Sequence, residues 1–116
     1  MKLFISLSST ISVEQTISRI KSMVAGTFTD PVRSNYCHRV SADYIRDNPN
    51  SHNFLALFGD SADKVVHSCI IDASGKIIAD SFLHLKPHIV NGYYVASSTR
   101  QLDGAKIIHT KRIDRL

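Results

Sequence analysis

The sequence predicts an α+β domain in which two N-terminal helices pack on an antiparallel sheet of about four or five strands. Apolar residues recur at helical spacing in the first 47 residues, whereas β-branched runs dominate the rest. The turn Asp72-Ala-Ser-Gly75 joins two of these runs and makes them antiparallel neighbours. A chain of 116 residues is long enough for one hydrophobic core, so we expect residues 1–116 to form a single domain.

The first helix is predicted from about Val13 to Ala25. Ser12 and Gln15 have the spacing of a capping box, and Gly26 is a usual residue just beyond a helix end. The apolar residues that follow at helical spacing are Val13, Ile17, Ile20 and Val24. Residues 27–35 are then expected to form a loop.

The second helix is predicted over Ser34–Asp47, with Ser34 as its N-cap and Asn48-Pro49 ending it. Cys37 falls in the first turn, near the positive end of the helix dipole, which favours thiolate over thiol. Val40 and Tyr44 share the face of Cys37, and Ser41 lies close to it. The alternative interpretation is that Cys37 is a small buried hydrophobic residue, which is the commoner fate of cysteine.

Apolar and β-branched runs predict the strands. Residues 83–92 are expected to be an irregular connection, residues 3–7 an edge strand or the lead into the first helix, and Asp103-Gly104 a turn. The most continuous β-branched run, 64–72, is expected to be the central, well-buried strand. The predicted strands are 53–58, 64–72, 76–82, 93–97 and 105–110.

His67 lies in the run expected to be central and shares its predicted face with Val65, Cys69 and Ile71. One interpretation is a functional imidazole, and the other is a core histidine that is hydrogen-bonded to backbone. A two-residue hairpin loop would put Asp80 opposite His67, whereas a three-residue bulged loop would put Ser81 there. His38 is expected on a different helix face from Cys37 and is therefore a weaker candidate.

These residues supply the parts of a thiol enzyme. A thiolate attacks, an imidazole shuttles protons, and a carboxylate orients the imidazole. Backbone N–H groups at the start of the cysteine helix, assisted by Asn35 or Ser34, are candidates to stabilise an oxyanion. This chemistry is expected to require no cofactor.

The helix-borne cysteine, the Val-Val-His strand and the Ile-Ile-Ala-Asp-Ser strand resemble the papain-like superfamily. The likeness is greatest to its small bacterial peptidase, transglutaminase-like and deamidase branches, and it covers about residues 34–82. The resemblance implies a papain-like core with Cys37 as nucleophile, His67 as general base and acid, and Asp80 as orienting acid. It also implies a cysteine peptidase or an amidase or deamidase that acts on a protein or peptide substrate.

Two other functions are compatible with the sequence. A metal site built from Cys37, His38, His67 and Cys69 has suitable ligand types, but its spacing matches no common zinc pattern. A small basic interaction protein, such as an inhibitor or adaptor of a phage or mobile element, would instead use Cys37 and His67 as core residues. Thiol reactivity distinguishes the two interpretations: an interaction protein would have a buried, slowly reacting Cys37, whereas an enzyme would have an exposed Cys37 thiolate at neutral pH.

Charge and hydropathy limit the partners. The net charge is +4, and basic residues gather near the C-terminus, which allows weak contact with nucleic acid or an acidic partner. No stretch approaches the roughly 20 apolar residues of a membrane span. The apolar run after Met1 is too short for a signal peptide, and Glu14 follows soon. We therefore expect a cytoplasmic protein; export as an effector by a specialised route would leave no mark in the sequence.

Overall fold

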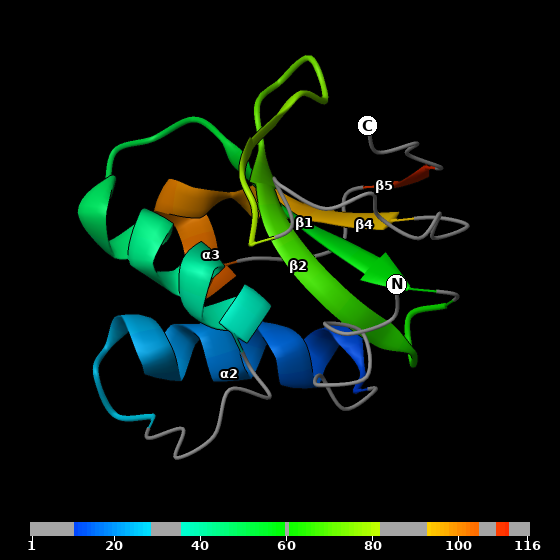
Figure 1. Cartoon of the computed structure of the whole chain (residues 1–116), viewed down its shortest axis with the longest axis horizontal. Coiled ribbons are helices and arrows are strands. Elements are labelled where there is room, and N and C mark those ends of the chain that lie inside the picture. The colour runs from blue at the N-terminus through cyan, green and yellow to red at the C-terminus, as the bar shows by residue number, and fades with distance from the viewer. Residues whose placement is uncertain (1–10, 29–35, 60, 82–92, 105–108, 112–116) are drawn as a thin grey trace.

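The structure, a computed structural model, describes residues 11–28, 36–59, 61–81, 93–104 and 109–111. Two helices lie together on one side of a five-stranded antiparallel sheet (Figure 1). The predicted α+β arrangement is therefore confirmed. Within the described ranges, no helix combines the length and the apolar character needed to cross a membrane.

The first of these helices, α2, spans Val13–Val24 and begins at the predicted capping box. The Ser12 side chain accepts from the Gln15 backbone N–H at 3.1 Å, and the Gln15 side chain accepts from the Ser12 backbone N–H at 3.1 Å. Gly26 follows the helix with a φ of +78°, a conformation that favours glycine. Local sequence signals therefore define both ends of α2.

The second helix, α3, spans Tyr36–Asp47, which puts Cys37 in its first turn as predicted. The expected N-cap, Ser34, lies outside the described residues. At its other end, the Arg46 guanidinium donates to the backbone carbonyls of Met23 and Val24. Because these carbonyls belong to the last turn of α2, Arg46 links the two helices at the end of α2, where the Met23 carbonyl also accepts from the Gly26 N–H.

The sheet has the strand order β3-β2-β1-β4-β5. The run 64–72, which was expected to be the central strand, corresponds to β2. This prediction is wrong, because β2 is second in the order and β1 is the central strand. A 3-10 helix, η2 (Thr99–Gly104), occupies the region where a turn at Asp103-Gly104 was expected. Residues 3–7, 83–92 and 105–108 of the predicted elements lie outside the described residues. The strands are β1 (Phe54–Gly59), β2 (Val65–Ile71), β3 (Ile77–Ala79), β4 (Tyr93–Ser98) and β5 (His109–Lys111).

The two faces of the sheet carry separate apolar clusters. The larger cluster lies between the sheet and the helices and includes Ile20 of α2, Ile45 of α3 and Leu55 of β1. The smaller one, on the alternate side chains of the strands, contains Ala56, Phe58, Cys69, Ile71 and Val95. Because both faces of the sheet are buried at β1 and β2, the sequences of these strands are nearly continuous apolar runs.

The β2–β3 hairpin differs from both registers considered for it. The Asp72 N–H donates to the Lys76 carbonyl, which defines a three-residue loop with Gly75 at a φ of +90°. One further residue is then inserted in β3, because Ile71 pairs with Ile77 but Ile70 pairs with Ala79. This bulge reverses the alternation of side chains once more. Asp80 therefore lies on the face of His67, although the loop alone would have turned it away.

A second irregularity lies beside His67. Phe58 pairs with His67 and Gly59 pairs with Val65, so Val66 is an extra residue in β2. The bulge turns Val65 into the cluster under the helices, whereas Cys69 and Ile71 remain on the other face. The predicted common face of Val65 and His67 is therefore wrong.

Gly59 is required by this bulge, because a Cβ atom there would lie 2.0 Å from the backbone oxygen of Lys64. We expect Gly59→Ala to lower the free energy of unfolding by about 2 kcal/mol, since backbone must move to relieve the overlap. Gly26→Ala, where nothing lies within 4 Å but φ is positive, should cost about 1 kcal/mol. Urea unfolding of both variants measures the difference, and equal stability of Gly59→Ala and wild type would contradict the prediction.

Candidate active site

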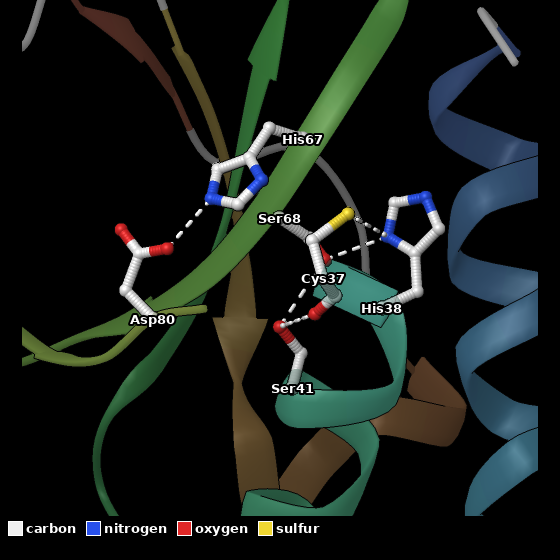
Figure 2. A network of polar contacts seen from close by, with 6 residues as sticks. All are labelled: Cys37, His38, Ser41, His67, Ser68 and Asp80. Carbon is white, nitrogen blue, oxygen red and sulfur yellow. Dashed lines mark hydrogen bonds and ion pairs between the residues drawn. The ribbon is translucent and has the colours of Figure 1, made fainter. Parts of the chain in front are cut away.

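Cys37 lies where the start of α3 meets β2. Its side chain is part of a polar group that includes two histidines, two serines and an aspartate (Figure 2). The residue is 3% exposed, so its thiol is almost fully removed from solvent. Such a polar cluster in a buried position costs free energy unless its members pair with one another.

His67 and Asp80 form a buried pair next to Cys37. The Nε2 atom of His67 lies 2.8 Å from Oδ1 of Asp80, and both side chains are 1% exposed. Figure 2 shows the His67 ring between Asp80 and Cys37, with its other nitrogen on the side of the sulfur. Because an ionised carboxylate only accepts, this contact places a hydrogen on Nε2 and leaves Nδ1 to exchange a proton with the thiol.

The location of His67 follows from the strand pairing. Its ring packs against Phe58 of β1 at a centroid distance of 5.7 Å. β3 pairs with Ile70 and Ile71, and Ile11 forms a bridge with Val65. Between these two contacts, Ser68 of β2 contacts His38 and Ser41 of α3, so the start of the helix meets the strand beside His67.

His38 also contacts Cys37, contrary to the expectation that adjacent helix residues point apart. Its Nδ1 atom lies 3.6 Å from the Cys37 sulfur and 2.7 Å from the Ser68 hydroxyl. The ring is 1% exposed and is therefore a buried member of the site. Successive residues of a helix are rotated by about 100° around its axis, but the rotamer of His38 turns its ring back toward Cys37.

The surroundings of Cys37 favour its charged form. Burial raises the pKa of the thiol, but the charge and hydrogen bond of His38, followed by those of His67, act in the opposite direction and prevail. The pKa of Cys37 is accordingly held well below its usual range. A lowered pKa gives a cysteine more thiolate, the nucleophilic form, near neutral pH.

The structure brings three of the predicted residues together: Cys37, His67 and Asp80. Of the two residues considered as the partner of His67, Asp80 rather than Ser81 makes the contact, through a register that neither loop alone would give. The two candidates for assisting an oxyanion, Ser34 and Asn35, lie outside the described residues. Among the described residues, no group of three or more histidine, cysteine or acidic side chains is arranged to hold a metal ion.

Sequence reasoning did not identify the partners on the helix side of Cys37. Ser68 was missed, His38 was considered only as a weaker candidate on a different helix face, and Ser41 was noted only for its position near the cysteine face. A signal was available for Ser68, a polar residue inside an otherwise apolar run, and for Ser41, four residues after Cys37. For His38, the rotamer decides the contact, and sequence spacing does not report rotamers.

Comparisons of the chain with models of protein families, with curated proteins and with solved structures found no match.

Proposed function

We propose that this protein is a thiol-dependent acyl-transfer enzyme of the papain-like type, a cysteine peptidase or an amidase or deamidase. In this proposal Cys37 is the nucleophile, His67 the general acid and base, and Asp80 the orienting acid on a protein or peptide substrate. The observation that carries the proposal is a thiol of lowered pKa beside an imidazole whose far nitrogen lies 2.8 Å from a buried carboxylate. Few structural roles need all three groups in this order.

The proposed reaction has two steps. The Cys37 thiolate attacks the carbonyl carbon of an amide, and the protonated His67 gives its Nδ1 proton to the leaving nitrogen as the C–N bond breaks. This leaves a thioester on Cys37. Water or an amine then attacks the thioester, passes its proton to His67 and releases the thiolate. Hydrolysis, deamidation and transfer to an amine share this thioester and differ in the acceptor.

Burial of Cys37 limits the access of reagents to its sulfur. At 3% exposure, the sulfur is reached by a reagent only when the residues around it move. The rate at which a reagent modifies Cys37 therefore depends both on how easily the reagent reaches the sulfur and on whether the sulfur is a thiolate. Thiolate absorbance near 240 nm reports the charge without a reagent, so the two measurements together separate these effects.

We expect the Cys37 thiolate to persist as the pH falls below the ordinary cysteine pKa, because the pKa of the folded thiol is lowered. The measurement is absorbance at 240 nm against pH in Cys69→Ser, with Cys69→Ser/Cys37→Ser as the blank. Incubation with p-nitrophenyl acetate should then release nitrophenol and leave an acetyl group on the Cys37 peptide, detected by mass spectrometry.

Cys69 provides the internal control, since it is 0% exposed and lies in the apolar cluster on the other face of the sheet. Its peptide in wild type should not be acetylated while the protein is folded. An ordinary thiol titration for Cys37, together with acetylation only after unfolding, would refute the enzyme and favour the interaction protein.

A further inference from the structure

A chain of buried hydrogen bonds runs from His38 back to the backbone of Cys37. His38 Nδ1 lies 2.7 Å from the Ser68 hydroxyl, which lies 3.1 Å from the Ser41 hydroxyl. The Ser41 hydroxyl in turn donates to the Cys37 carbonyl at 3.1 Å. His38, Ser41 and Ser68 are all 1% exposed or less, and Figure 2 shows the chain closing around the cysteine.

The direction of this chain follows from counting hydrogens. A carbonyl oxygen only accepts, so the single hydrogen of Ser41 is used on Cys37. Ser41 must then accept from Ser68, which uses the single hydrogen of that residue. Ser68 has no further hydrogen to give, so it accepts from His38. The hydrogen between His38 and Ser68 therefore belongs to Nδ1 of the ring.

The one hydrogen on Nδ1 can reach the sulfur as well as Ser68 only as a three-centre bond, in which the contact to the Ser68 hydroxyl is 2.7 Å and the contact to Sγ of Cys37 is 3.6 Å. The opposite tautomer would direct a lone pair at the sulfur and could not stabilise a negative charge there. We infer that His38 is a positioning residue that donates an Nδ1 hydrogen to the Cys37 thiolate, and that Ser68 and Ser41 hold this hydrogen on Nδ1 both in the neutral ring and in the imidazolium.

This assignment gives the two histidines different roles. His67 is backed by the Asp80 carboxylate, which supports the charge that develops on a ring during proton transfer. His38 is backed by hydroxyls that end at a carbonyl, which fix a hydrogen but provide no counter-charge. His38 and His67 both act on the Cys37 thiol, and Asp80 lies behind His67. The inference rests on the proposed function only for the use of the thiolate in acyl transfer.

The first test is the tautomer itself. Long-range ¹H–¹⁵N NMR of the His38 ring in the folded full-length chain should show the hydrogen on Nδ1, and Ser68→Ala should shift the ring toward a mixture of tautomers. A hydrogen only on Nε2 in the wild type would overturn the inference. This measurement requires no substrate and no reagent.

The second test uses a matched pair of variants in Cys69→Ser. His38→Leu removes the donor, whereas His38→Asn keeps an amide N–H near the position of Nδ1. We expect His38→Leu to reduce the thiolate fraction at a fixed pH by about tenfold, measured at 240 nm below the midpoint of the titration, and His38→Asn to restore most of it. If both variants titrate like the parent, the inference is wrong.

Two controls keep these outcomes distinct. If His38→Leu does not fold, His38→Asn, Ser68→Ala and the wild-type tautomer still decide the inference. Acetylation by p-nitrophenyl acetate is measured on the same samples and tests the proposed function separately. An Nδ1 hydrogen and a donor-dependent thiolate without acetylation would support the role of His38 and reject the enzyme.

Discussion

Asp80→Asn is expected to slow acetylation of Cys37 by about two to four orders of magnitude while the protein remains folded. The carboxylate accepts from Nε2 of His67 and fixes the tautomer in which Nδ1 faces the thiol. An amide in the same place offers its own N–H to Nε2, which moves the ring hydrogen to the wrong nitrogen. The rate of nitrophenol release under single-turnover conditions measures the effect.

Asp72→Asn is the matched control, because Asp72 belongs to the same hairpin but lies at the turn. Its carboxylate accepts from the hydroxyl and N–H of Ser74 and from the N–H of Lys76, which hold the pKa of this exposed group below its ordinary value. Acetylation of Cys37 should be unchanged in this variant. Equal rates for Asp80→Asn and wild type would remove Asp80 from the proposed mechanism.

His67 and Asp80 should also be strongly coupled in stability. Replacing either one alone with leucine leaves a polar or charged group buried without its partner, at an expected cost of about 4 kcal/mol in the free energy of unfolding. Replacing both removes the buried polar pair altogether. We therefore expect the double variant to be less destabilised than the sum of the single variants by at least about 1 kcal/mol.

Urea unfolding of wild type, both single variants and the double variant gives this coupling energy directly. Asp43→Leu with Arg46→Leu is a matched control, because this pair has a 3.0 Å contact but its side chains are 42–49% exposed. The control pair should show a coupling near zero. Additive effects at His67 and Asp80 would mean that their contact contributes nothing specific to the fold.

The sequence predicts well those parts of this structure that depend on neighbouring residues. Ser12 and Gln15 define the start of α2 through bonds within one turn, and Gly75 marks the hairpin because its φ is positive. Cys37 falls in the first turn of α3 for a similar reason: a residue's place in a helix follows from counting along the chain. These features need no knowledge of the rest of the fold.

Contacts that depend on register or rotamer were harder to predict. The pairing of His67 with Asp80 depends on one extra residue in β3, and no residue type in that strand marks a bulge. The contact of His38 with Cys37 depends on a side-chain torsion that packing selects. The central position of β1 rather than β2 depends on pairing with β4, which is distant in sequence.

The near-complete burial of Cys37 has a consequence for the lifetime of the protein. A thiolate is also the form of cysteine that peroxides attack, and repeated oxidation to sulfinic acid is irreversible for most proteins. A sulfur that is 3% exposed meets dissolved oxidants only during brief openings of its surroundings. The arrangement that withholds Cys37 from solvent therefore also protects it against irreversible oxidation.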